Sequence, residues 1–148
     1  MIAPLYLEDL RVGDRFSSAE HALDEAQIKA FAAQFDPQPF HLDDEAAKDT
    51  IFQGLAASGW HTASITMKLM VTSGLRIAGG MVGAGGEVQW PRPTRATDVL
   101  HVEMEVLDVR PSSSRPDRGM ATVRSETKNQ HGDVLQVLTS KMVVWRRT

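Results

Sequence analysis

The apolar residues in the first half of the chain recur with the spacing of a helix. The segment "LDEAQIKAFAAQF", residues 23–35, carries one apolar stripe, and Asp24 with Gln27 three residues later forms a capping-box pattern at its start. Pro37 and Pro39 should end this helix, because proline lacks a backbone donor and biases the preceding residue away from helical geometry. The stripe consists of Ile28, Phe31, Ala32 and Phe35.

A second helix is predicted in "ASGWHTASITMKLMVTSGL", residues 57–75. Ser58 can cap its start and Gly74 can mark its end. Small and apolar residues occupy nearly every face of this segment, a pattern typical of a buried helix. The isolated Lys68 must then reach an opening or a partner. The side chains expected in the core are Trp60, Met67 and Met70.

The second half of the chain changes to the period-two alternation of strands. In the longest run, Leu100, Val102, Met104 and Val106 face one way and His101, Glu103 and Glu105 face the other. The segment "NQHGD" is typical of a hairpin turn. Helices followed by strands with short connections indicate an α+β fold, in which an antiparallel sheet curls around the central helix. The strands are expected at residues 82–90, 98–109, 119–129 and 133–145.

Composition and charge narrow the classes of function. The 148 residues fit one domain, the absence of cysteine excludes disulfides and thiolate chemistry, and a cytoplasmic setting is expected. Neither a signal peptide nor a membrane span is predicted. The net charge of −3 argues against nucleic-acid binding, although residues 75–148 carry +3. The arginines of this basic half either bind an anionic ligand or form a solvated face. They are Arg76, Arg92, Arg95, Arg110, Arg115 and Arg118.

The segment "FAAQFDPQPFHLDDEAA", residues 31–47, contains the candidate chemistry. Taken alone, Asp36 and His41 fit either a solvated turn or an acid–base pair held by a proline-stiffened loop. A metal site is a further alternative, because histidine and carboxylates are competent ligands. No pair of histidines has helical i, i+4 spacing, so we expect no metal and interpret Asp43 and Asp44 as caps of a short helix. The metal alternative would use His41, Asp43, Asp44 and His61.

Nearly the whole chain resembles the MaoC-like, (R)-specific enoyl-CoA hydratases. The motif that carries the resemblance is an Asp five residues before a His, a proline between them, an acid two residues after the His and a glycine opening the central helix. Here these residues are Asp36, Pro39, His41, Asp43 and Gly59. The segments "LYLEDLRVGDRF" and "EVQWPRPTRATDVL" look like further parts of the family's sheet, the first being its opening strand. The resemblance implies a single hotdog domain over residues 1–148.

The resemblance also implies roles for individual residues. Asp36 would be the general base on water, His41 would share that water, and the amide of Gly59 would bind the thioester oxygen. Candidate substrate-binding residues on the same helix are Ser58, Trp60 and Ser64, although Ser64 can instead bond the carbonyl of the preceding turn. The chain departs from the family pattern at three places: Gln38 replaces Asn, Ser58 replaces His, and Thr97-Asp98 replaces the Gly-Asp that often opens the fourth strand.

The implied activity is reversible hydration of a trans-2-enoyl-CoA, or an acyl-carrier thioester, to an (R)-3-hydroxyacyl thioester, without a cofactor. The resemblance also implies a homodimer. Two alternatives remain open: a hotdog thioesterase and a non-catalytic acyl-thioester-binding subunit. Hotdog thioesterases place their acid on the central helix, and residues 60–73 contain neither Asp nor Glu, which counts against the first alternative.

Overall fold

The protein is described by a computed structural model that covers residues 3–147. Four α-helices and a 3₁₀ helix accompany a six-stranded antiparallel sheet. The helices are η1 (Leu7–Asp9), α1 (Glu25–Phe35), α2 (Pro39–Leu42), α3 (Asp44–Ala47) and α4 (Gly59–Val71). The strands are β1 (Arg15–Ser17), β2 (His21–Ala22), β3 (Val82–Gln89), β4 (Val99–Pro111), β5 (Arg118–Lys128) and β6 (Val134–Trp145).

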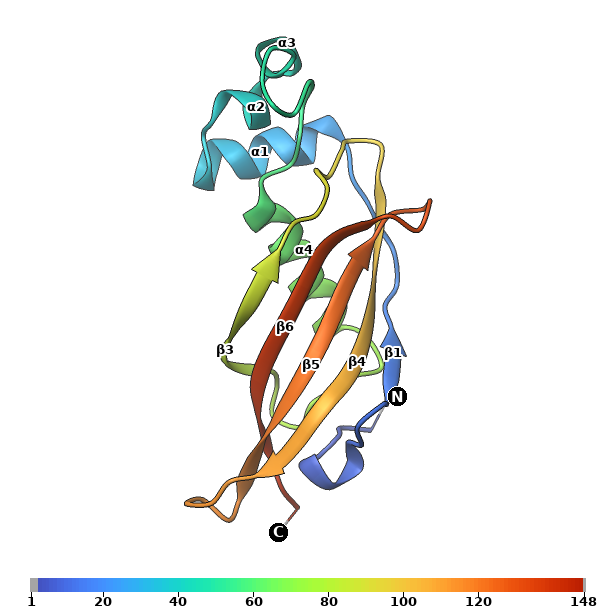
Figure 1. Cartoon of the computed structure of the whole chain (residues 1–148), viewed down its shortest axis with the longest axis vertical. Helices are drawn as coiled ribbons and strands as arrows, with labels where there is room; N and C mark the ends of the chain where they lie inside the picture. Colours follow the sequence, from blue (N-terminus) through green and yellow to red (C-terminus); the bar gives the residue numbers. More distant parts are fainter. Residues whose placement is uncertain (1–2, 148) are drawn as a thin grey trace.

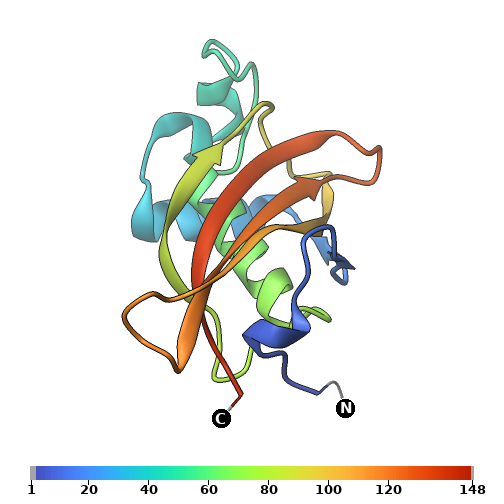
Figure 2. The same cartoon turned by 60° about the horizontal axis from the view of Figure 1, so that its bottom comes forward.

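The sheet wraps around α4, as expected for a hotdog domain. Its strand order is β1-β4-β5-β6-β3, and β2 adds to β4. Figure 2 shows the long strands curving across α4, which lies against the concave face of the sheet. Helices α1, α2 and α3 gather beyond one end of the sheet, near the start of α4, and both termini lie at the opposite end (Figure 1). This arrangement leaves the first turn of α4 between the small helices and the sheet.

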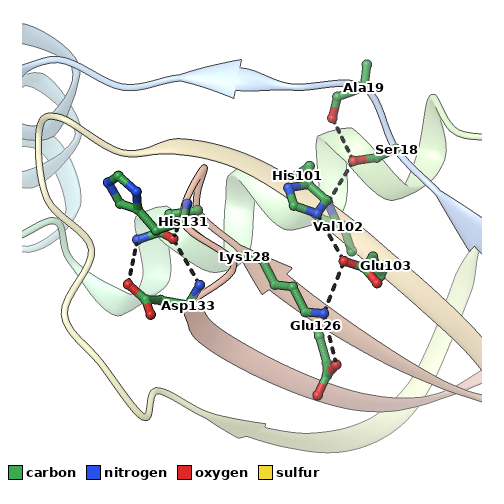
Figure 3. A network of polar contacts seen from close by, with 10 residues as sticks. Ser18, Ala19, His101, Val102, Glu103, Glu126, Lys128, His131 and Asp133 are labelled. Atoms are coloured by element: carbon green, nitrogen blue, oxygen red, sulfur yellow. Dashed lines mark hydrogen bonds and ion pairs between the residues drawn. The ribbon is translucent and has the colours of Figure 1, made fainter.

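The alternation predicted for β4 is confirmed. Leu100, Val102, Met104 and Val106 are all at most 2% exposed and belong to the core that packs against α4. The opposite face of the same region carries a polar network (Figure 3). There Glu103 accepts from His101 at 3.0 Å and pairs with Lys128 at 3.1 Å. The hydrogen bonds from His101 and Lys128 lower the pKa of the Glu103 carboxyl.

Helix α1 begins as predicted, because the Asp24 carboxylate accepts from the backbone N–H of Gln27 at 2.8 Å. The apolar stripe is only partly correct. Ile28 and Ala32 are fully buried, whereas Phe35 at the end of the helix is exposed. In a single chain, Ile28 and Ala32 therefore pack in the core, and Phe35, the last residue of the stripe, lies at the surface.

Helix α4 is capped as predicted, since the Ser58 side chain accepts from the N–H of Trp60. The expectation that this helix is buried all round is wrong for the single chain. The sheet covers only one side of α4, so that Trp60 is 60% exposed and Met67 46%, whereas Met70 is fully buried. Lys68 finds its partner in His21, whose Nδ1 lies 2.8 Å from the Lys68 ammonium.

Three local predictions need correction. The opening segment contains the 3₁₀ helix η1, where the Asp9 carboxylate accepts from the N–H of Tyr6, and a strand forms only at Arg15–Ser17. Helix α4 ends at Val71, before Gly74. Asp43 caps α3, but Asp44 instead accepts from the N–H of Leu55 at 2.9 Å. Within residues 3–147, no helix is long and apolar enough to cross a membrane.

The Asp24 cap generates a stability prediction. We expect Asp24→Ala to lower the free energy of unfolding by about 1 kcal/mol, because an N–H in the first turn of α1 loses its acceptor. Chemical denaturation checks this. The control is Glu25→Ala, which removes the neighbouring acid; its ion pair with Lys29, at 3.7 Å, is exposed and contributes little. Equal losses in the two variants would contradict the capping role.

Candidate active site

A cavity of about 360 Å³ lies at the N-terminal end of α4. It is bounded by the segment between α1 and α2, by the first turn of α4 and by the chain that follows β3. The cavity therefore lies where the small helices, the central helix and the sheet meet. Its lining residues are Asp36, His41, Phe52, Ala57, Gly59, Trp60, Thr62, Trp90, Pro91, Arg92, Pro93 and Thr94.

The chain folds locally so that Asp36 and His41 meet. Asp36 is the C-terminal cap of α1, and its non-helical backbone, with φ −153° and ψ 66°, turns the chain away from the helix axis. Pro39 then starts α2, where a proline is tolerated because the first-turn N–H groups have no helical partner. His41 consequently lies on a helix, not in the loop that the two prolines predicted. Its Nε2 lies 3.3 Å from Oδ2 of Asp36.

The protonation of His41 follows from its second contact. Nδ1 lies 2.6 Å from the carbonyl oxygen of Ala56. Because a carbonyl oxygen can only accept, Nδ1 must carry a proton. In the neutral ring, Nε2 is then a lone pair facing the Asp36 carboxylate. Nε2 of His41 and the Asp36 carboxylate are therefore two neighbouring hydrogen-bond acceptors. They favour a ligand with two donors, and a water molecule can donate to both.

Two side chains hold the Asp36 carboxylate. The Ser58 hydroxyl donates to Oδ2 at 2.7 Å, and the Gln38 amide donates to Oδ1 at 2.5 Å. Partial burial works to raise the pKa of Asp36, but the hydrogen bonds from Ser58 and Gln38, with the charge of His41, outweigh it. The pKa of Asp36 therefore lies below its ordinary value, and the group is ionised at neutral pH.

Gly59 contributes its backbone and its lack of a side chain. Its N–H, in the first turn of α4, donates to no atom of the described residues. The indole of Trp90 lies directly against its Cα, since a Cβ at this position would be 2.7 Å from Cε2 of Trp90. Close packing of Trp90 is thus a reason for glycine here, in addition to the free amide that the sequence predicted.

The loop that orients His41 is fixed by residues that the sequence did not single out for this role. The Arg95 guanidinium donates to the carbonyls of Phe52, Gly54 and Leu55, at 2.5, 3.0 and 3.1 Å. Together with the Asp44 contact to Leu55, this clamp sets the position of the Ala56 carbonyl. From the sequence alone, Arg95 is identified only as one of the basic residues of the second half. No pattern around Arg95 predicts hydrogen bonds to carbonyls about 40 residues earlier in the chain.

The remaining candidates fall in different places. Trp60 lines the cavity, and Ser58 reaches Asp36 from behind it. Ser64 donates to the carbonyl of Trp60 at 2.8 Å, the alternative given for it, and is not among the residues that line this cavity. His61 stacks on Phe31 with ring centroids 4.5 Å apart, and burial lowers its pKa. In residues 3–147 no cluster of three or more His, Asp or Glu residues could hold a metal.

The contact between Ser58 and Asp36 generates a prediction that does not depend on activity. We expect Ser58→Ala to raise the pKa of Asp36, because the ionised carboxylate loses a donor. The measurement is an NMR titration of the Asp36 carboxyl carbon. Ser64→Ala is the matched control, since it removes a hydroxyl from the same helix without touching Asp36. An unchanged titration midpoint in Ser58→Ala would show that the hydroxyl does not tune the acid.

Comparison with known proteins agrees with this geometry. The family model described as "MaoC like domain" matches residues 10–129. A MaoC-like dehydratase from Rhodospirillum rubrum is 62% identical, with a TM-score of 0.95, over 97% of this chain and 99% of that one. The (R)-hydratase from A. caviae involved in PHA biosynthesis is 25% identical, with a TM-score of 0.70, over 95% and 99% of the two chains.

A curated relative extends the similarity to a protein without an assigned activity. The uncharacterised protein YdeM of Bacillus subtilis (strain 168) is 34% identical over 127 residues, which is 84% of this chain and 87% of YdeM. The family model, the high identity to the Rhodospirillum structure and the hotdog arrangement point to the same conclusion. The chain belongs to the MaoC-like dehydratase family.

Proposed function

We propose that the protein adds water reversibly to a trans-2-enoyl thioester, with CoA or an acyl carrier protein as the carrier, to give an (R)-3-hydroxyacyl thioester. The observation that carries this proposal is the 3.3 Å approach of His41 Nε2 to Asp36 Oδ2 at the cavity beside the free N–H of Gly59. Membership of the MaoC-like family and the similarity to (R)-hydratases support the same reaction class.

The acid–base pair handles the protons of the reaction. Water donates to the Asp36 carboxylate and to Nε2 of His41, and its oxygen attacks the β-carbon of the enoyl group. The pair accepts the proton that water loses, and one proton is delivered to the α-carbon, so that a hydroxyl and a hydrogen have been added overall. General acid–base catalysis of this kind contributes about 10²–10⁴-fold to a rate.

The negative charge that develops on the thioester oxygen needs a donor. The N–H of Gly59 is suited to this role, because it has no partner among the described residues and lies at the positive end of the α4 dipole. The Ser58 side chain binds the N–H of Trp60, not that of Gly59, so the cap leaves the Gly59 donor free. The proposed chemistry uses no cofactor beyond the thioester substrate.

A thioesterase remains less suited to this site. The acid that lines the cavity is Asp36, at the end of α1, and the 13-residue helix α4 carries no carboxylate. The oriented tautomer of His41, beside a carboxylate that is ionised at neutral pH, also favours proton chemistry over a site that only binds acyl groups.

Substitution of the pair tests the reaction. With crotonyl-CoA as substrate, we expect Asp36→Asn and His41→Ala each to lower kcat/KM by about 10²–10⁴-fold, because either change removes one of the two groups that share the water. Loss of enoyl absorbance measures the rate. Asp43→Asn is the control, since Asn still caps α3 and residue 43 does not line the cavity.

Two results would reject the assignment. If the wild-type protein hydrates no enoyl thioester of any chain length, the hydratase proposal fails. If the wild type is active and Asp36→Asn keeps that activity, Asp36 is not the base.

We further propose that the protein is a homodimer, with the second copy placed on α4 and β3. Trp60, Met67 and Val71 form an exposed apolar face on α4. Strand β3 runs beside α4 in both views and ends the sheet, so one of its edges is unpaired within residues 3–147 (Figures 1 and 2). A free edge next to an apolar helix face is a surface that proteins normally cover. Trp60 belongs to both this face and the cavity, so a second copy would also complete the wall of the site.

A charged residue introduced into the apolar face of α4 should weaken the proposed dimer. We expect the wild type to sediment as a dimer and Met67→Glu to shift it toward monomer, because an unpaired carboxylate would be buried in the interface. Leu107→Glu is the control, since Leu107 lies on β4 and is similarly exposed at 40%. A monomeric wild type, or a dimer unaffected by Met67→Glu, would contradict this arrangement.

A further inference from the structure

The indole of Trp90 is inserted between the first turn of α4 and strand β6. One face of the ring lies against the Cα of Gly59, where even a Cβ would be only 2.7 Å away. Its N–H donates to Oε1 of Gln136, on β6, at 2.9 Å. Trp60 meets it edge-on, with ring centroids 5.4 Å apart and planes at 84°. Three contacts, two from α4 and one from β6, therefore hold the ring in one position.

The space behind Trp90 is filled by a buried polar layer. Gln136, Thr66 and Thr127 are all completely buried. The Gln136 amide donates to the Thr66 hydroxyl at 3.1 Å, and the Thr66 and Thr127 hydroxyls lie 2.6 Å apart. An alkyl chain pushed past Trp90 would separate these groups and leave buried donors and acceptors without partners, which is costly. The region between helix and sheet is thus closed to an alkyl chain by shape and by polarity.

Two buried hydroxyls also contribute to the lining of the cavity, which is otherwise largely apolar. Thr62 and Thr94, both buried, line it and are joined by a hydrogen bond of 3.0 Å between their hydroxyls. The cavity volume of about 360 Å³ lies at the small end of the roughly 300–1,000 Å³ that ligand pockets occupy. Within one chain, this volume has to hold both the reacting thioester and the acyl group, and the second copy proposed above would add a wall beside Trp60.

We infer that the site accepts only short 2-enoyl groups and that Trp90 sets the limit on acyl chain length. This inference rests on the proposed function and names its substrate class. A fixed indole bounds the cavity on the side of the helix–sheet interior, and a polar layer lies beyond it. A four-carbon chain fits in front of this wall, whereas an eight-carbon chain would have to displace the indole and separate the hydrogen-bonded groups of the polar layer.

The test compares kcat/KM for crotonyl-CoA and trans-2-octenoyl-CoA. The wild type should prefer the four-carbon substrate. Trp90→Ala should raise the ratio of octenoyl to crotonyl activity by at least about 10-fold, because each methylene that finds apolar contact contributes up to about fourfold. Trp90→Leu and Trp90→Phe shrink the wall in steps and should give smaller increases. These two variants also decide the question if the alanine variant does not fold.

The control is Trp145→Ala. Trp145 is 43% exposed and Trp90 40%, but Trp145 lies at the other end of the sheet, outside this cavity. Its ratio should equal that of the wild type. A wild type equally active on both substrates, or folded Trp90 variants with an unchanged ratio, would overturn the inference.

A second measurement separates this inference from the proposed reaction. Binding of the unreactive butyryl-CoA and octanoyl-CoA is measured by isothermal titration calorimetry. The wild type should bind the shorter acyl group more tightly, and Trp90→Ala should shift the ratio of Kd values toward the longer one. If no hydration occurs but this shift is found, the reaction is wrong and the chain-length limit stands. If neither acyl-CoA binds, or the ratio does not move, the chain-length limit is wrong.

Discussion

One hydroxyl group joins the parts of the site. The oxygen of Ser58 accepts from the N–H of Trp60 and so caps α4, while its proton is donated to the Asp36 carboxylate. Ser58 and Asp36 are 22 positions apart, yet the Ser58 hydroxyl connects the start of the central helix to the end of α1. The free amide of Gly59 follows directly in the chain. The distance between the Asp36 carboxylate and the Gly59 amide, the proposed base and oxyanion donor, is consequently set by the same contact that begins the helix.

The histidine is oriented by a longer chain of contacts. Arg95 holds the loop of residues 52–55, this loop presents the carbonyl of Ala56, and the carbonyl fixes the proton on Nδ1 of His41. Nε2 is then the atom left to face Asp36. The Arg95 guanidinium, which neither lines the cavity nor contacts Asp36, thereby determines which nitrogen of His41 faces the carboxylate and would take part in the proposed proton transfer. Preorganisation of this kind reduces the rearrangement needed when substrate binds.

The predictions made from sequence succeeded where the physics is local. Examples are the Asp24 cap, the Ser58 cap and the alternation along β4. Each depends on residues a few positions apart, so the local sequence is sufficient to predict it. Helix α2 was missed because Pro39 was interpreted as a helix breaker, although proline is equally compatible with a first helical position. The Asp44 contact to Leu55 and the Arg95 clamp were also missed, because they join segments that only the folded chain brings together. The exposure of Met67 escaped prediction because periodicity shows that a face is apolar but not which element covers it.

Two of the positions at which the chain departs from the family pattern serve one carboxylate. Gln38 and Ser58 are the two residues that donate to Asp36, one to each oxygen. Each donor favours the charged form, and together with His41 they keep the pKa of Asp36 low despite partial burial. An acid held in this way stays ionised at neutral pH but is a weak base in the resting site. In the proposed reaction, Asp36 would take a proton efficiently only when the water that it shares with His41 becomes more acidic, as the bond from that water to the β-carbon forms.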